Sequence, residues 1–215
     1  MPAKPTVYLI DRPGSEQSLI IAGHVAPPKN NPDEVGIETM LNILGNDFTS
    51  RVNMNLREDK HWSYGAFVFI RDARGQRPFI GYAPVQTDKT KESMIELARE
   101  LRDIVGNRPI TNDEFAKAQT NAALQLPGSW ETMAAVGGSL GQIVQFGFPD
   151  SYFQTYAQRI RALKLDDVQT AANKVVHQDN LVWVVIGDRA KIEAGVRELN
   201  FGELRYIDAD GNPVK

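Results

Sequence analysis

Arg57 and Tyr64 are seven residues apart in the stretch NLREDKHWSYGAF (55–67), where the local pattern changes from helix-like to strand-like. A guanidinium offers a planar fork of donors to a carboxylate or a carbonyl, and a phenol hydroxyl can donate to a developing negative charge. Structural roles are equally available. Arg57 would be a cation near a helix C-terminus, worth about 0.3–1 kcal/mol, and Tyr64 a packed strand aromatic. Spacing alone favours these structural roles.

The other residues that could do chemistry form no recognisable motif. His24, His61 and His177 have no histidine or carboxylate at metal-ligand spacing, and neither H-x-x-E-H nor H-E-x-x-H occurs. The chain has no cysteine, which excludes thiol catalysis, thiolate metal sites and disulfides. No G-x-S-x-G elbow or phosphate-binding glycine loop is present. The residues therefore predict no metal site within this chain.

Two further features favour structural explanations. The glycine-rich segment GGSLG (137–141) lies within helix-like sequence, so close helix packing or a kink is favoured over ligand binding. The adjacent carboxylates Asp166 and Asp167 are better suited to cap a helix than to do acid–base work.

The composition is that of an ordinary globular protein and argues against several classes of function. Of the 215 residues, 42% are hydrophobic and 24% are charged, so a continuous core can form. A net charge of −3, with no clustered Lys/Arg stripe, argues against a nucleic-acid partner. The longest apolar run, LVWVVIG (181–187), is much shorter than the about 20 residues that cross a bilayer.

Hydrophobic periodicity indicates which elements must position Arg57 and Tyr64. Helices are expected over 33–45, 49–58, 87–105 and 111–126, in three pieces across 130–178, and near 192–199. Strands are expected over 6–10, 17–25, 62–72, 77–88, 180–188 and 203–207. This order predicts an α+β fold, with helices packed on one face of a mostly antiparallel sheet. One domain over residues 1–215 is the simplest organisation.

Three local signals are more specific. Thr111 precedes Glu114 by three residues, which is the spacing of a capping box. The apolar residues of 87–105 form the cleanest helical stripe in the chain. The continuous apolar run within 180–188 predicts a strand that is buried on both faces.

The segment LNILGNDFTSRVNMNLREDKHWSYGAF (41–67) resembles the one that marks the zinc-free half of the pitrilysin/insulinase metallopeptidases, the inverted zincins. The shared pattern is a helix ending in Leu-Gly, an aromatic residue, Ser50–Arg51, Leu56–Arg57–Glu58, a short turn and Tyr64–Gly65. Similar segments follow in order over most of the chain: IDRPGSEQS, VQTDKTKESMIEL, QLPGSWET and VVIGD. The ending YIDADGNPVK resembles the C-terminal domains of large bacterial zinc proteases.

This resemblance implies a divided catalytic site. Family members pair homologous α+β domains face to face, as a clamshell around a closed chamber. One half holds zinc on H-x-x-E-H and a further glutamate, and the other contributes an arginine and a tyrosine that match Arg57 and Tyr64. By resemblance, Arg57 would orient the peptide and Tyr64 would stabilise the oxyanion. The helix that matches the zinc helix, GIETMLNILG, has no histidine. This chain alone is therefore predicted to be inactive and to hold no cofactor.

The resemblance also implies partners and a location. The expected partners are a homologous zinc-bearing domain or subunit and a peptide substrate, bound in extended form along a sheet edge. The chain is expected to be the C-terminal part of a longer protein. A periplasmic or secreted bacterial location is implied by resemblance alone, and a cytoplasmic location stays open.

Two alternatives remain. The chain could be a catalytically silent structural or peptide-binding and assembly domain of the same superfamily, which would be favoured if its partner also lacked H-x-x-E-H. A weaker alternative is an independent enzyme of unknown type, which peptide hydrolysis by the isolated chain, together with stoichiometric zinc, would support.

Overall fold

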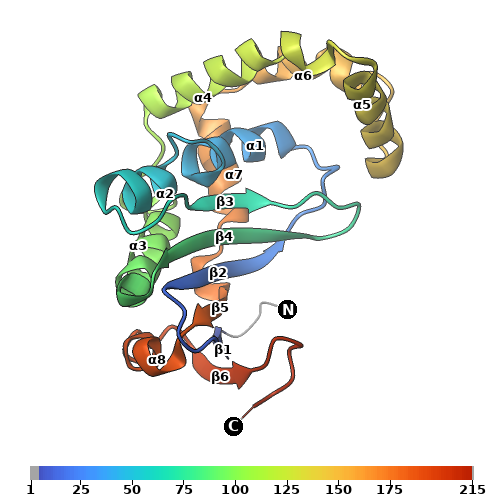
Figure 1. Ribbon diagram of the computed structural model, residues 1–215. Helices are drawn as coiled ribbons and strands as arrows, with labels where there is room; N and C mark the ends of the chain where they lie inside the picture. The colour runs from blue at the N-terminus through green and yellow to red at the C-terminus, as the bar shows by residue number, and fades with distance from the viewer. Residues whose placement is uncertain (1–4, 215) are drawn as a thin grey trace.

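The computed structural model describes residues 5–214, and its six strands form one sheet in the order β3-β4-β2-β5-β1-β6. The strands are β1 (Thr6–Asp11), β2 (Gln17–Ala26), β3 (Phe67–Ile70), β4 (Arg77–Gln86), β5 (Val182–Gly187) and β6 (Glu203–Ile207). Pairs β3–β4, β4–β2 and β2–β5 are antiparallel, whereas β1 pairs in parallel with both β5 and β6. The sheet is therefore mostly antiparallel, as predicted, and Figure 1 shows its twisted ladder of strands.

The helices follow the predicted order closely. They are α1 (Glu34–Leu41), α2 (Arg51–Asn53), α3 (Thr90–Asp103), α4 (Asn112–Gln125), α5 (Met133–Phe146), α6 (Tyr152–Ala162), α7 (Leu165–Val175) and α8 (Arg189–Glu198). Helix α1 continues into a π-helical turn, η1 (Asn42–Asn46), and α2 into another, η2 (Met54–Asp59). Short 3-10 turns are η3 (Thr87–Lys89), η4 (Pro127–Trp130) and η5 (Gln178–Asn180). None of the helices within residues 5–214 combines the length and apolar character needed to span a bilayer.

Helices cover one face of the sheet. On that face the strand register aligns buried residues of neighbouring strands into a continuous apolar surface. Ile20 of β2 lies between Ala83 of β4 and Val185 of β5, and all three are fully buried. Helix α3 contacts β2 and β4, α8 contacts β1, and α7 crosses behind the strands in Figure 1. The α+β fold with helices on one face of the sheet is thus confirmed.

The expectation that 180–188 is buried on both faces is wrong. Trp183 and Val185 are buried, whereas Val182, Val184 and Ile186 are only half-buried. The helices described here cover one face, so alternate residues of an apolar run meet different environments.

Helices α4, α5 and α6 form an arch beyond β3 (Figure 1). The arch has a small core of its own, in which the ring of Phe148 stacks on Tyr152 at 3.8 Å and Phe146 lies 5.6 Å from Phe148. The segment GGSLG lies inside α5, but a Cβ on any of its three glycines would have no neighbour within 4 Å. Close packing at these glycines against the described part of the chain, one of the two expected explanations, is therefore not observed.

Candidate functional site

The helix that carries Arg57 is anchored by Arg51, a residue of the Ser50–Arg51 pair. The Arg51 side chain is almost fully buried, and its guanidinium donates to both carboxylate oxygens of Glu114, at 2.6 and 2.7 Å. It also donates to the carbonyls of Arg108 and Pro109, at 2.5 and 3.0 Å. These bonds hold α2 to the start of α4, and Arg57 follows in the last turn of η2.

Glu114 takes part in two structures at once. Thr111 and Glu114 form the predicted capping box at the start of α4. Burial raises the pKa of the Glu114 carboxyl, but the hydrogen bonds from Arg51 and Thr111 outweigh burial and lower the pKa to about 2. The carboxylate that caps α4 is thus also the counter-ion that holds Arg51 in place.

Tyr64 lies in a braced turn rather than in a strand, so the expectation of a strand starting at 62 is wrong. The backbone N–H of His61 donates to the carbonyl of Arg57, and that of Trp62 to Leu56, which folds the chain back onto η2. Ser63 Oγ accepts from the N–H of Gly65 at 3.1 Å and donates to the carbonyl of Pro84 at 2.6 Å. These bonds divert the backbone from strand pairing, and β3 begins only at Phe67.

Asn53 joins the two sides of this turn. Its side chain is buried, with Nδ2 donating to the carbonyl of Phe48 at 2.6 Å and Oδ1 accepting from the N–H of Ala66 at 3.2 Å. Phe48 lies under Arg57, whose guanidinium carbon is 4.6 Å from the ring centroid. One amide therefore positions both the ring beneath Arg57 and the backbone two residues after Tyr64.

Arg57 and Tyr64 line the same surface hollow, which has a volume of about 270 Å³. The Tyr64 residue is 87% exposed, and its hydroxyl has no hydrogen-bond partner among the described residues. The Arg57 side chain is 38% exposed, and its Nε lies 3.2 Å from Glu58 Oε1. The hollow is completed by Gln17, Glu58, His61, Trp62, Ser63 and Gln86. The structure thus brings the two predicted residues to one open site.

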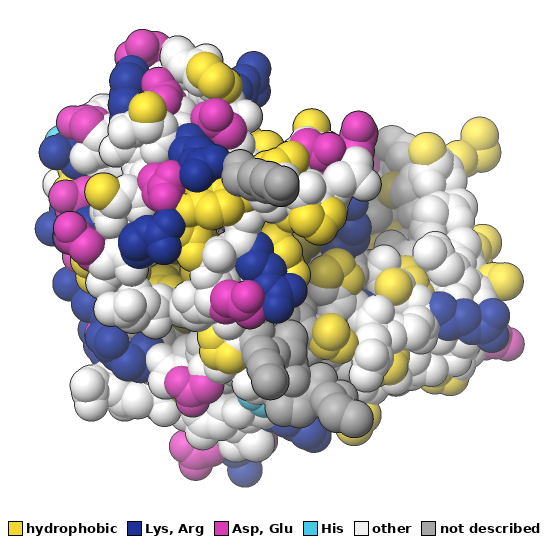
Figure 2. Space-filling model, turned by 90° about the horizontal axis from the view of Figure 1, so that it is seen from below, with side chains coloured by type: hydrophobic (Ala, Val, Ile, Leu, Met, Phe, Trp, Pro, Cys, Tyr) yellow, Lys and Arg dark blue, Asp and Glu magenta, His cyan; other side chains and the backbone are white. Residues whose placement is uncertain are grey.

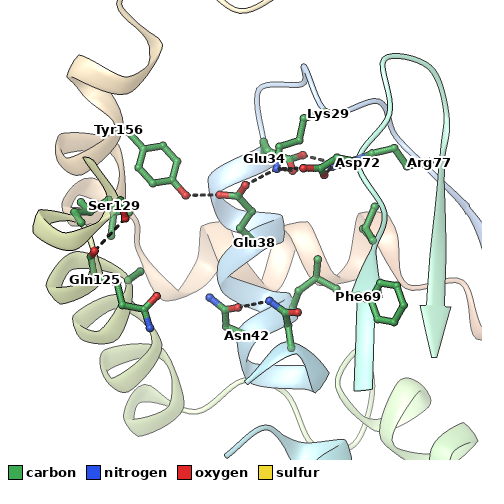
Figure 3. A pocket seen from close by; sticks show the side chains of 16 residues that line it. Lys29, Glu34, Glu38, Asn42, Phe69, Asp72, Arg77, Gln125, Ser129 and Tyr156 are labelled. Carbon is green, nitrogen blue, oxygen red and sulfur yellow. Dashed lines mark hydrogen bonds and ion pairs between the residues drawn. The ribbon is translucent and has the colours of Figure 1, made fainter. Parts of the chain in front are cut away.

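A larger hollow, of about 360 Å³, lies beside α1, but its charged side chains are already paired (Figure 3). The buried carboxylate of Glu34 accepts from Arg77 at 2.6 Å, and Arg77 is also paired with Asp72. Glu38 accepts from Lys29 at 2.7 Å and from the hydroxyl of Tyr156. Sequence reasoning missed this cluster, because its members come from four separated segments with no shared motif.

The pKa values in this cluster follow from burial and charge. Burial disfavours the ammonium of Lys29, but the carboxylates of Glu38 and Glu34 outweigh it and raise the pKa of Lys29. Burial, with Glu38 beside it, also raises the pKa of the Tyr156 hydroxyl. Both side chains therefore keep their protons at neutral pH, which suits a structural ion-pair network.

The described residues do not suit a bound zinc ion. They contain no group of three or more histidines, cysteines or carboxylates that could hold a metal. The carboxylates of Glu34 and Glu38 on α1 already bind lysine, arginine and tyrosine partners. His24 and His177 have ring centroids 5.3 Å apart, but the backbone N–H of His177 donates to the ring of His24. No catalytic step through a metal is therefore assigned to this chain.

The chain is similar in structure to domains of bacterial proteases. A peptidase M16 inactive domain from Pseudomonas fluorescens matches with a TM-score of 0.79 and 20% identity, over 86% of this chain and 43% of that one. The inactive peptidase domain of a Bordetella parapertussis protein described as a zinc protease matches with a TM-score of 0.69 and 22% identity, over 82% and 94%. The periplasmic protease PqqL from Escherichia coli matches with a TM-score of 0.70 and 13% identity, over 86% and 21%.

At these identities the structural matches establish the fold. The chain spans less than half the length of the Pseudomonas structure, and about a fifth of PqqL. No curated protein gives a match. The model of one protein family, described as the peptidase M16 inactive domain, matches residues 2–122, which is more than half of the chain. Together with the zinc-protease domains that share its fold, this match shows that the chain belongs to the peptidase M16 family and carries its inactive domain.

Proposed function

We propose that residues 1–215 form one domain, the zinc-free half of a zinc metalloendopeptidase, and that Tyr64 and Arg57 complete a catalytic site in another domain or subunit. The observation that carries this proposal is the shared surface hollow, which is lined by both Arg57 and Tyr64, with the tyrosine hydroxyl unbonded among the described residues. A site divided between two bodies needs such groups exposed in each half, since they must reach across to the substrate.

Tyr64 has the features of an oxyanion donor. Its hydroxyl has no partner to give up among the described residues, so donation to a substrate oxygen breaks no bond within this domain. The braced turn holds its backbone, which reduces the reorganisation needed when charge develops on that oxygen. A donor aimed at the tetrahedral intermediate stabilises the transition state more than the ground state.

Arg57 has the features of a residue that orients the peptide. Its guanidinium lies over Phe48 and beside Glu58, which limits its rotamers while leaving over a third of the side chain exposed. A planar fork held in this way can bind a backbone carbonyl or a carboxylate of the substrate. The proposed substrate is therefore a peptide, and the proposed partner is the homologous domain that carries the zinc. Since one relative of this fold is a periplasmic protease, a periplasmic location is part of the proposal.

Replacement of Tyr64 by phenylalanine in the assembled enzyme tests the proposal. Turnover should fall by about 10²–10³, the usual cost of one missing oxyanion donor, with little change in KM. The matched control is Tyr206→Phe, which removes a hydroxyl bonded to Glu193 near the opposite edge of the sheet. That control should keep wild-type turnover, and a Tyr64→Phe enzyme with equally unchanged turnover would refute the catalytic role.

The second candidate function is a catalytically silent structural or peptide-binding domain. Arg57 already has an intramolecular carboxylate and ring as partners, and this observation is compatible with a purely structural role. A silent domain predicts that Tyr64→Phe and Arg57→Lys leave turnover unchanged. Weaker peptide affinity in Arg57→Lys, with turnover intact, would assign the hollow to peptide holding.

A further inference from the structure

Helix α5 presents an apolar face that nothing in the described chain covers. Met133, Val136, Leu140 and Val144 are 92%, 41%, 59% and 79% exposed. Their spacing of three, four and four residues puts them along one side of the helix. The lobe on the right of Figure 2, where α5 lies, shows mainly uncharged and hydrophobic side chains. No charged residue occurs between Glu131 and Asp150, which is unusual for an exposed helix.

A neighbouring side of α5 already has a core. Phe146 is buried against Phe148, and Ile143 packs on the same aromatic cluster. The indole Nε1 of Trp130 donates to Ser139 Oγ at 3.0 Å, which also fixes the helix from that side. The exposed stripe is therefore additional to the contacts that hold α5 in the arch.

The glycines of α5 support the same interpretation. Glycine inside a helix destabilises it relative to alanine, and Gly137, Gly138 and Gly141 have neither a positive φ nor a neighbour that a Cβ would meet. Nothing in the described chain therefore requires them. Gly137 and Gly141 are four residues apart and flank Leu140 on the exposed side. Small residues in this arrangement allow another backbone to approach the helix closely.

We propose that this face of α5 is the docking surface for a helix of the homologous domain that joins this one in a longer protein. The proposal rests on the proposed function in that it assumes such a partner domain. A lipid surface suits the face less well, because interfacial helices carry Lys and Arg, whereas α5 is flanked by Glu131 and Asp150. A lipid surface also does not explain the exposed glycines, whereas a docked helix does, because glycines allow its backbone to approach closely.

The size of the face argues for a tethered partner rather than a second copy of this chain. A helix of 14 residues is about 21 Å long and about 10 Å wide, so its face offers roughly 200 Å² of footprint. Complexes between independent proteins bury about 1,200–2,000 Å² in total. A domain held on the same polypeptide has a high effective concentration and needs much less area. The chain spans only 43% of the Pseudomonas relative, which leaves room for such a domain in longer family members.

Thiol accessibility in the complete polypeptide tests the proposal, since this chain contributes no cysteine of its own. Leu140→Cys is compared with Gln145→Cys, an exposed position on the same helix that lies off the stripe. Any cysteines elsewhere in the polypeptide are replaced first. The rate of maleimide labelling in the native protein is divided by the rate after unfolding in urea. If the face is docked, Leu140→Cys should be labelled at least roughly tenfold more slowly in the native protein than in urea. Gln145→Cys should be labelled at a similar rate in both states.

Three outcomes would overturn the proposal. Equal labelling of the two variants would mean that the face is open. Protection that disappears on strong dilution would identify a second copy as the occupant, and protection that appears only with phosphatidylcholine vesicles would identify a membrane.

The thermal stability of Gly137→Ala is an independent test of docking. Without docking the substitution should leave the midpoint of thermal unfolding unchanged or higher, whereas close docking predicts a lower one. These readouts need no turnover, so failure of the Tyr64→Phe test would leave them informative.

Discussion

Removal of the Asn53 side chain amide is the sharpest perturbation of the site that the structure suggests. In Asn53→Ala the N–H of Ala66 loses its acceptor and the carbonyl of Phe48 loses its donor. Ala66 is fully buried, so water cannot readily replace Asn53 there, whereas Phe48 is half exposed. The two losses are therefore unequal.

The expected cost follows from that difference. A buried donor left without a partner costs about 1–3 kcal/mol, and an ordinary hydrogen bond is worth about 0.5–1.5 kcal/mol. The sum is about 3 kcal/mol, which lowers the midpoint of thermal unfolding by on the order of 10 °C for a chain of this size. Asn53→Ala also removes a hydrogen bond that holds the turn carrying Tyr64. Under the proposed function, turnover of the assembled enzyme should therefore also fall at temperatures where the variant is folded.

Thermal unfolding followed by circular dichroism, with Asn46→Ala as the matched control, checks this prediction. Asn46 is exposed, and among residues 5–214 its side chain bonds only to that of Asn42, so the loss of stability in Asn46→Ala should stay within about 0.5 kcal/mol. Asn53→Asp keeps the acceptor for Ala66 but places a carboxylate against the carbonyl of Phe48. It should therefore also be destabilised. Equal midpoints for Asn53→Ala and Asn46→Ala would refute the reasoning.

Three further predictions concern stability. Arg77→Met leaves the carboxylate of Glu34 buried without its guanidinium partner and should cost about 3–5 kcal/mol in urea unfolding. The pKa of Glu114 is about 2 in the folded chain, below its ordinary value of 4.5. The contribution of the Glu114 carboxylate to the free energy of unfolding is therefore complete above about pH 4.5 and is lost as the pH falls towards 2. The difference in stability between wild type and Glu114→Gln should shrink over that pH range. Gly45→Ala should be severely destabilised, because its Cβ would lie 2.2 Å from the backbone nitrogen of Val68.

Each of these predictions has a control. Arg102→Met removes an exposed guanidinium bonded to Asp103 and should cost far less than Arg77→Met. Glu131→Gln removes an exposed carboxylate that forms no ion pair with the described residues, so the stability of this variant should keep the acid dependence of the wild type. Gly75→Ala meets no neighbour within 4 Å and should unfold like the wild type. Similar unfolding of Gly45→Ala and Gly75→Ala would contradict the close approach at Val68.

Local features of the fold could be predicted because they depend on nearby residues. The capping box of Thr111 and Glu114 formed where the spacing placed it, and β6 has the predicted bounds. The apolar stripe of α3 is buried at Met94, Leu97 and Leu101. Helical and strand periodicities and caps are properties of a few consecutive residues, so they are visible without knowledge of the rest of the chain.

The resemblance of 41–67 to the zinc-free peptidase domains is confirmed at the level of the family. The predicted roles of Arg57 and Tyr64 stay predictions, although both residues line one hollow. The expected strand at 62–66 was wrong, because Ser63 and Asn53 bind the backbone that a strand would have used. Side-chain competition of this kind cannot be read from alternation of polar and apolar residues.

The sequence by itself determined the α+β class, the helical block and the position of the candidate residues, since each depends on local pattern or on an ordered motif. Tertiary structure alone decided which partners meet across the chain: Arg77 with Glu34, 43 residues away, and Arg51 with Glu114, 63 residues away. It also decided that one face of the sheet stays partly open and that the stripe on α5 faces outward. The physical reason is that burial and pairing depend on which distant segments are brought together, and local periodicity does not record that choice.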